Sequence, residues 1–360
     1  MTIISRNTKR TVKRRRVVTV ICGTTTICLM WYIFVFGLSS NTNHNIEDYL
    51  RTFIEVQRKT PKELIQSVVR NIEGDGWKIA TFDSNEPNIH GFECEMVPFI
   101  RSSNNETTGH KICVHRFDDV ISNFLRRDGY WGDCDVLPRF WTSEVAYNAI
   151  DPIYVEVGAN IGSCIMEMLF NTDATIVAFE PNPKNLYPLK KTLSSLPKIY
   201  QERVALFPIA LGSTKSSSTI YSANNNMGNS HVGKAVTDLD METQVFHEKD
   251  TFEIKVERLD SILETGSNIP LMKLDAQGFE CEILEGMGRD LASTVDHVHF
   301  EKADRFLSAH DCNNLLARFR NLGFTIYDQN NEIVGPKKDD ENLAYDLEAK
   351  RKKTMKLFWL

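Results

Sequence analysis

The stretch that decides the fold is Val155-Glu156-Val157-Gly158-Ala159-Asn160-Ile161-Gly162. An apolar run that ends in glycines and leads into the helical pattern of residues 163–170 is typical of a strand, a tight turn and a helix. Backbone N–H groups at such a turn bind nucleotide-like ligands. The glycine spacing is not G-x-G-x-x-G, and the turn lacks G-x-x-x-x-G-K-[ST], so a nicotinamide dinucleotide and the usual phosphate cradle are both disfavoured.

The pattern of this first unit repeats along the rest of the chain. Helical patterns separate short apolar runs, and this alternation predicts an α/β fold with a largely parallel sheet covered on both faces. Ligands bind such sheets at the carboxyl ends of the strands. The expected strands are 153–157, 175–179, 204–209, 271–274, 297–300 and 324–327, and the expected helices are 163–170, 184–196, 279–287 and 309–321.

The end of the second expected strand carries Glu180, eighteen residues after Gly162. A carboxylate at this place can accept hydrogen bonds from both hydroxyls of a ribose. Together with Glu156 and Gly158, it suits an adenosyl group joined to a cationic amino acid.

Three motifs in this order make the sequence resemble the FkbM-type family of S-adenosylmethionine-dependent methyltransferases. They are the turn at 155–162, then Phe179-Glu180-Pro181-Asn182-Pro183, then Lys273-Leu274-Asp275-Ala276-Gln277-Gly278-Phe279-Glu280 followed by Ile283-Leu284-Glu285-Gly286. The resemblance covers roughly residues 150–330. It implies a Rossmann-like, seven-stranded class I methyltransferase sheet and S-adenosyl-L-methionine as the cofactor.

The resemblance also implies which residues hold the cofactor. These are Glu156, Gly158, Ala159, Asn160, Gly162, Glu180, Pro181 and Asp275, the last beside the methyl donor. The chain departs from the commoner sequence of the family motif at two positions. Gln277 stands where an acidic residue is frequent, and Cys281 stands beside Glu280. The amide at Gln277 puts any carboxylate-dependent role at that position in doubt.

Methyl transfer requires alignment of donor and acceptor and removal of a proton from the acceptor. We expect three residues to serve as catalytic groups: Asp275 at the end of the fourth strand, Glu301 after the strand 297–300, and His231 in the polar loop 224–233. The alternatives are a turn carboxylate, a plain strand-end carboxylate and a solvated histidine, respectively. No Cys or His array has metal-ligand spacing, so we expect no metal site.

A membrane anchor is expected at the N-terminus. Residues 17–38 are apolar and uncharged, and as a helix they would span roughly 33 Å, enough for a bilayer core of about 30 Å. Seven basic and no acidic side chains precede them, which predicts a cytosolic N-terminus and a lumenal body in the Golgi or endoplasmic reticulum. A cleaved signal peptide and a buried core helix are the alternatives.

These features divide the chain into six expected parts. They are a cytosolic basic tail (1–16), a signal anchor (17–38), a stem (39–75), an extension packed on the catalytic domain (76–150), the methyltransferase domain (151–335) and a C-terminal tail (336–360). Within the extension we expect strands at 78–82 and 111–117, a loop at 98–110 and a helix at 118–127.

Six cysteines follow the expected anchor, and a sequon for N-glycosylation begins at Asn105. In the implied fold, Cys164 and Cys281 lie on helices at opposite faces of the sheet and should not pair with each other. We expect both to be small buried residues, and we expect the disulfides to involve Cys94, Cys113, Cys134 and Cys312.

The net charge of −6 is the sum of a basic N-terminal tail and an acidic remainder. Residues 1–16 contain seven basic side chains, and the rest of the chain contains 35 basic and 48 acidic ones. The acidic body argues against nucleic-acid binding. Cofactor and compartment together predict an O-methyltransferase acting on a glycan hydroxyl. The alternatives are a lipid or small-metabolite acceptor, and a non-catalytic binding or trafficking protein that uses the same fold.

Overall fold

The computed structural model describes residues 59–83, 90–103, 106–145, 151–223, 225–233, 251–336 and 346–351. The expected basic tail, signal anchor and most of the stem lie outside the described residues, as does Asn105 of the sequon. None of the helices in the described ranges is both long enough and apolar enough to cross a membrane.

A seven-stranded sheet with the order β14-β15-β13-β12-β5-β6-β7 forms the centre of the domain, which confirms the predicted number of strands. β5, β6, β7, β12 and β13 are parallel, while β15 lies antiparallel between β13 and β14. The strands are β5 (Pro152–Val157), β6 (Thr175–Phe179), β7 (Val204–Phe207), β12 (Asn268–Leu274), β13 (Val295–Glu301), β14 (Thr325–Tyr327) and β15 (Asp346–Lys350).

Helices cover both faces of this sheet, as the sequence predicts, because successive strand residues point into two separate cores. Val155 of β5 belongs to one core and Tyr154 to the other. The first core includes α3 (Pro61–Val68), α9 (Leu259–Ile262), α10 (Glu280–Ala292) and α12 (Leu315–Asn321). The second includes α5 (Leu137–Val145), α6 (Ser163–Asn171) and α7 (Pro183–Ser195). The short helices α8 (Lys198–Gln201) and α11 (Asp304–Ala309) complete the set around the sheet.

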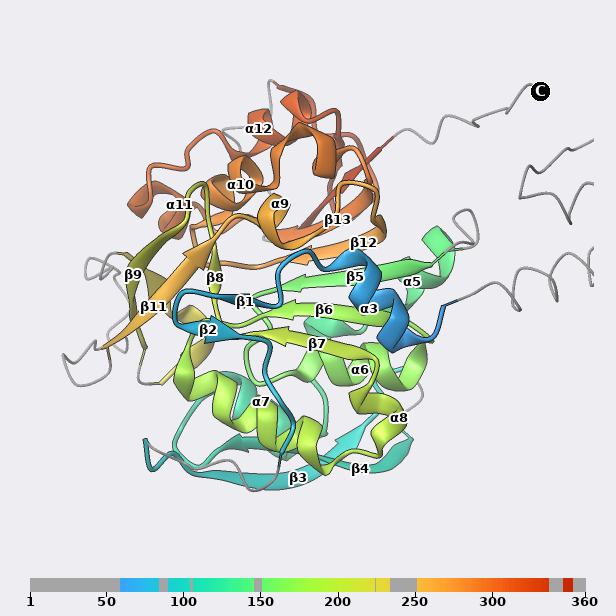
Figure 1. The fold of residues 1–360 in the computed structure, drawn as a ribbon, viewed down its shortest axis with the longest axis vertical. Coiled ribbons are helices and arrows are strands. Elements are labelled where there is room, and N and C mark those ends of the chain that lie inside the picture. Colours follow the sequence, from blue (N-terminus) through green and yellow to red (C-terminus); the bar gives the residue numbers. More distant parts are fainter. Residues whose placement is uncertain are drawn as a thin grey trace, which may run out of the picture. The chain divides into compact units, whose positions relative to one another are not determined.

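A second, four-stranded sheet with the order β10-β9-β11-β8 was not predicted. Its strands are β8 (Ala210–Leu211), β9 (Ser216–Tyr221), β10 (His231–Val232) and β11 (Thr251–Glu257), and the turn η2 (Met227–Asn229) precedes β10. In Figure 1 the arrowheads of β5, β6 and β7 point toward the side on which β8, β9 and β11 lie. The small sheet therefore stands where the parallel strands end.

The extension packs on the helices of the second core. It forms a hairpin of β3 (Cys94–Ile100) and β4 (Thr107–His115), then α4 (Val120–Asp128), η1 (Gly132–Cys134) and α5. The expected loop at 98–110 is therefore wrong over most of its length, because both hairpin strands enter it. The Cys113 backbone N–H donates to Thr192 Oγ1 of α7 at 2.8 Å, which ties the hairpin to the domain. The expected strand at 78–82 is reduced to β2 (Trp77–Lys78), which pairs with β1 (Glu73–Gly74).

Two expected boundaries are wrong. The stem was expected to reach residue 75, but α3 begins with a Thr60–Glu63 capping box and buries Leu64 and Val68 in the first core. The tail was expected from residue 336, but β15 lies inside the sheet, with Leu347 fully buried. Both segments are short, so only packing against the domain makes their structure evident.

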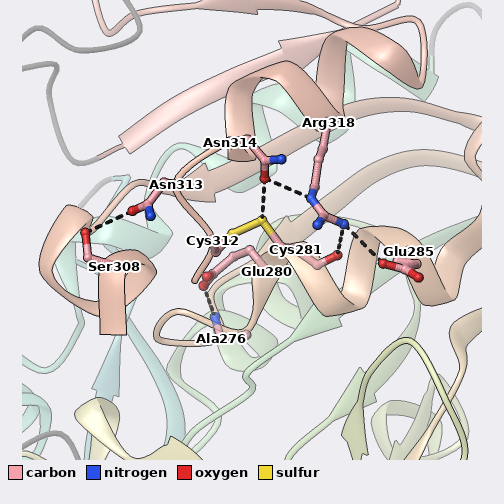
Figure 2. The surroundings of a disulfide bond; sticks show 9 residues. All are labelled: Ala276, Glu280, Cys281, Glu285, Ser308, Cys312, Asn313, Asn314 and Arg318. Atoms are coloured by element: carbon pink, nitrogen blue, oxygen red, sulfur yellow. Dashed lines mark hydrogen bonds and ion pairs between the residues drawn. A yellow bond between two sulfur atoms is a disulfide. The ribbon is translucent and has the colours of Figure 1, made fainter. Parts of the chain in front are cut away.

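Three disulfides join Cys94 to Cys113, Cys134 to Cys164 and Cys281 to Cys312, with Cα–Cα distances of 5.6, 4.9 and 5.6 Å. Cys164 and Cys281 do lie in opposite cores and do not pair with each other. The expectation that both are free is wrong. Each finds a partner outside the central sheet, Cys164 in η1 of the extension and Cys281 in the segment between α11 and α12 (Figure 2).

Candidate active site

The turn after β5 brings three strand ends together. The backbone N–H groups of Gly158 and Ala159 both donate to the Phe179 carbonyl at 3.0 Å, and the Asp275 N–H donates to the Val157 carbonyl at 3.1 Å. Gly158 has a φ of +81°, and a Cβ there would lie 1.9 Å from the Asp275 carbonyl oxygen. Only glycine fits, because both the backbone conformation and the approach of the two loops exclude a side chain.

A cavity opens at these strand ends. Five of the residues that we expected to bind the cofactor line it: Gly158, Asn160, Glu180, Pro181 and Asp275. The small sheet and the start of α10 supply apolar walls. These are Ile209, Leu211, Ile220, Val232, Phe279 and Ile283.

Glu180 is buried against the turn. Its carboxylate accepts hydrogen bonds from the backbone N–H of Asn160 at 2.7 Å and of Asn182 at 2.8 Å. Burial raises the pKa of Glu180 to about 7, and the two backbone donors oppose this rise. The Asn185 side chain also hydrogen-bonds to this carboxylate. A carboxylate has about four acceptor sites, so the group can still accept a hydrogen bond from a ligand hydroxyl.

Three residues expected at the cofactor do not line the cavity. Gly162 is the left-handed N-cap of α6, and Ala159 is a buried core residue. Glu156 is 1% exposed and pairs in register with Lys273 of β12, on the sheet face opposite to Val157. Burial raises the pKa of Glu156 to about 8, and the Lys273 charge opposes the rise. The prediction of direct cofactor contact by these three residues is therefore not supported by their positions.

Asp275 and Glu301, two of the expected catalytic residues, belong to one hydrogen-bonded group. Gln277 Nε2 donates to Asp275 Oδ1 and to Glu301 Oε2, both at 2.7 Å. Lys273 Nζ forms an ion pair with the other oxygen of Asp275 at 2.8 Å. The structure therefore brings together two side chains that the sequence only suggested to be at a similar level of the sheet.

The two carboxyl groups differ in acidity. Burial and the neighbouring Asp275 charge raise the pKa of Glu301 to about 8. Burial would also raise the pKa of Asp275, but the Lys273 charge and the hydrogen bonds from Lys273 and Gln277 outweigh it, so this pKa is lowered. Near neutral pH the pair therefore holds one proton, on Glu301, and one negative charge, on Asp275.

His231 lies in a different environment from the one expected. It is fully buried in β10, where Nδ1 lies 3.2 Å from the Gln277 carbonyl oxygen and the ring packs edge-on against Phe306. It does not line the cavity, whereas its neighbours Ser230 and Val232 do. The structure therefore gives His231 a supporting position behind Gln277 rather than that of a solvent-exposed base.

His299 is a core residue whose ring is hydrogen-bonded. Its Nδ1 lies 2.7 Å from Glu348 Oε1 of β15, and the side chain is 6% exposed. His297 contacts the other oxygen of Glu348. The residues that sequence reasoning missed at the site are Lys273 and Gln277, although both stand inside the motif that contains Asp275.

Part of the chain is similar to known methyltransferases. A family model, the methyltransferase FkbM domain, matches residues 156–326. No curated protein matches the sequence. A methyltransferase FkbM structure from Methylobacillus flagellatus KT is 15% identical, with a TM-score of 0.34, and the match covers 55% of this chain and 43% of that one. A precorrin-6y C5,15-methyltransferase from Geobacter metallireducens GS-15 is 12% identical, with a TM-score of 0.26 and coverages of 56% and 80%.

The matched residues contain the turn at Gly158, the strand end at Glu180 and the Asp275–Gln277–Glu301 group. Residues 156–326 of this chain therefore match the methyltransferase FkbM domain.

Proposed function

We propose that this protein is an S-adenosylmethionine-dependent O-methyltransferase that methylates a sugar hydroxyl of glycans in the secretory pathway. The observation that carries the proposal is the hydrogen-bonded Asp275–Gln277–Glu301 group, in which Asp275 and Gln277 line the cavity and Gln277 links them to Glu301, which does not line it. In this group Glu301 can accept a proton and Asp275 carries a negative charge. Methylation of a hydroxyl by a cationic donor is favoured by both.

The cavity fits the proposed cofactor. The Gly158 turn leaves no room for a Cβ beside Asp275, so backbone and ligand can approach closely. Glu180 would accept the ribose hydroxyls, the apolar walls around Phe279 would enclose the base, and Asp275 would face the cationic end. When bound, S-adenosylmethionine supplies a methyl group on a sulfonium; the S–C electron pair returns to sulfur as the acceptor oxygen bonds the methyl carbon.

The chain's own residues handle the remaining proton. The acceptor hydroxyl loses it to Glu301 in those molecules in which this carboxyl group is ionised, a fraction that grows as the pH approaches its raised pKa of about 8. Gln277 holds the Glu301 carboxylate in place through its amide hydrogen. Asp275 keeps its negative charge because Lys273 and Gln277 stabilise the ionised form. The products are the methyl ether, the demethylated cofactor and the proton that Glu301 has accepted.

The compartment is part of the proposal. The apolar segment 17–38 behind seven basic residues favours a single-pass anchor with the catalytic domain in the Golgi or endoplasmic reticulum lumen. Three disulfides are consistent with an oxidising compartment. Glycans are the abundant polyhydroxylated acceptors there.

Calorimetry with the full chain in detergent tests the cofactor. Wild type is expected to bind S-adenosylmethionine, and Glu180→Ala is expected to bind at least about tenfold more weakly, since a charged-group hydrogen bond is lost. Glu202→Ala is the matched control, because Glu202 is exposed and does not line the cavity. Equal binding by all three proteins, or binding by none, would contradict the proposed site.

The acceptor is tested in cells. Methylated monosaccharides are compared in glycans from cells with and without the gene, by mass spectrometry of the hydrolysed sugars. At least one methyl sugar is expected to disappear, and an unchanged set would exclude the glycan acceptor.

A further inference from the structure

Gln277 has a side-chain amide whose NH₂ group is hydrogen-bonded and whose carbonyl oxygen is not, within the described residues. Its side chain is 8% exposed and lines the cavity. Both hydrogens of Nε2 are taken by the carboxyl groups of Asp275 and Glu301. The carbonyl Oε1 is buried and has no hydrogen-bond partner within the part of the chain that the structure describes.

The orientation of this amide follows from chemistry. Asp275 is ionised, so its Oδ1 at 2.7 Å can only accept a hydrogen bond, and the end of the Gln277 amide that faces it must be the NH₂ group. Exchanging the two ends would place the Gln277 carbonyl oxygen against this carboxylate. Oε1 is therefore directed away from the carboxyl pair, and the backbone is held there by the contact of the Gln277 carbonyl with His231.

A buried carbonyl at a cavity is stabilised when a ligand hydroxyl or an ordered water donates a hydrogen bond to it. We propose that Gln277 Oε1 accepts a hydrogen bond from the acceptor substrate, and that Gln277 selects a neutral, hydroxyl-bearing acceptor rather than an anionic one. This inference rests on the proposed function and names the substrate class and the residue that recognises it.

The charges around Gln277 agree with a neutral acceptor. Asp346 of β15 pairs in register with Glu301, and its pKa is raised by burial and by the Asp275 charge, among others. The pKa of Asp133 in η1 is also raised, first by burial and then by the negative charge of Asp346. Lys273, the cation near both groups, is already paired with Asp275. A sulfate, phosphate or carboxylate on the acceptor would meet net negative charge here.

Matched acceptors test the charge selection. The purified full chain is given radiolabelled S-adenosylmethionine and a panel of p-nitrophenyl glycosides, each neutral hexoside beside its uronic acid and its sulfated derivative. The expected result is label in neutral glycosides, with kcat/KM at least about tenfold lower for each anionic counterpart, the scale of one lost hydrogen bond or like-charge contact. Equal or better use of the anionic counterparts, or no labelled neutral glycoside, would overturn the inference.

Two variants of Gln277 test the carbonyl itself. Gln277→Met removes the carbonyl and the NH₂ group, so it should raise the acceptor KM at least about tenfold and also lower kcat, because Glu301 loses its hydrogen bond. The Kd for S-adenosylmethionine should change by no more than about threefold. In Gln277→Glu the protonated side chain keeps a carbonyl and one O–H donor, so its acceptor KM should be near wild type below pH 6 and rise with pH. Thermal unfolding confirms that each variant is folded.

The outcomes separate the two proposals. If wild type binds S-adenosylmethionine but Gln277→Met changes only the cofactor Kd, Gln277 Oε1 serves the cofactor, and the inference is wrong while the proposed function stands. If wild type binds no S-adenosylmethionine, the proposed function itself fails.

Discussion

Lys273 Nζ lies 2.8 Å from Asp275 Oδ2, and the two residues stand two positions apart at the end of the central strand β12. The Lys273 side chain is 10% exposed and that of Asp275 is 32% exposed. Lys273 also pairs in register with Glu156 on one side and His299 on the other. The lysine therefore neutralises a buried row of acidic groups and fixes the charge of the carboxylate at the site.

Replacement of this lysine should destabilise the protein and change its titration. Lys273→Met leaves Asp275 and Glu156 without their cation, and the free energy of unfolding should fall by about 2–3 kcal/mol, less than for a fully buried pair because Asp275 is partly exposed. Urea unfolding at pH 7 measures the loss. Lys198→Met is the control, since Lys198 is exposed on α8; an equal loss in both variants would contradict the role of Lys273.

Stability should fall as the pH rises from about 5 to 8. The pKa values of Glu156 and Glu301 are raised to about 8, and those of Glu180 and Glu280 to about 7, each chiefly by burial. Between the unfolded pKa of about 4.5 and these values the folded protein holds protons that the unfolded chain has lost, so rising pH favours unfolding.

Glu156→Gln isolates one of these groups. The amide mimics the protonated carboxyl, so this variant should gain stability over wild type at pH 8 relative to pH 5, by up to about 1.4 kcal/mol per pH unit in the titrating range. Denaturant unfolding at both pH values gives the difference. Glu202→Gln, on the surface, should show no such gain; a flat difference for Glu156→Gln as well would exclude a buried protonated Glu156.

Methyl transfer should increase with pH toward about 8. Glu301, which we propose as the proton acceptor, can take a proton only when it is ionised, and its raised pKa keeps it protonated at lower pH. The acceptor kcat/KM of wild type should therefore drop about tenfold per pH unit well below this pKa. Glu301→Gln should lose about 10²–10⁴-fold in kcat and lose this pH dependence. A Glu301→Gln profile parallel to that of wild type would assign the titration to another group.

Gly158→Ala should lose cofactor binding. A Cβ at this position would lie 1.9 Å from the Asp275 carbonyl and in a backbone conformation that side chains rarely adopt, so the loops of β5 and β12 must separate. Calorimetry should detect no S-adenosylmethionine binding. Gly266→Ala is the control because a Cβ there has no neighbour within 4 Å and φ is not positive; unchanged binding by Gly158→Ala would contradict the described turn.

The Cys281–Cys312 disulfide should support the cofactor loop as well as the fold. Its neighbour Glu280 accepts a hydrogen bond from the Ala276 N–H at 2.8 Å, and Ala276 lines the cavity (Figure 2). Replacing both cysteines with serine should cost about 2–5 kcal/mol and weaken S-adenosylmethionine binding. Replacing Cys94 and Cys113 in the same way should lower stability but leave binding unchanged, since neither lines the cavity. Equal cofactor affinities in the two double variants would contradict a role of the Cys281–Cys312 disulfide in cofactor binding.

The sequence predicts those parts of the fold whose local pattern is strong. β5, β6 and β12 are apolar runs, and Glu180 and Asp275 follow strand ends, so their placement at one edge follows from a parallel sheet. β9 is missed because Ser216, Ser217 and Ser218 give it no apolar pattern, and β15 because it is short and charged. Both are stable only through pairing with distant strands.

The missed site residues have a different cause. Gln277 stands in a motif that was noticed, but its contacts with Asp275 and Glu301 depend on a left-handed backbone, with φ of +51°, that sequence does not indicate for glutamine. The disulfide partners of Cys164 and Cys281 likewise depend on how the extension and α11 pack, which no local pattern specifies.

The most direct test of the account is methyl transfer by the purified full chain. Glycans released from cells that lack the gene are incubated with S-adenosylmethionine labelled in the methyl group, using wild type, Glu301→Gln and Glu202→Gln. We expect labelled methyl ethers of sugars with wild type and Glu202→Gln, and at least about a hundredfold less label with Glu301→Gln. Wild-type protein that binds the cofactor but labels no sugar, or equal labelling by Glu301→Gln, would contradict it.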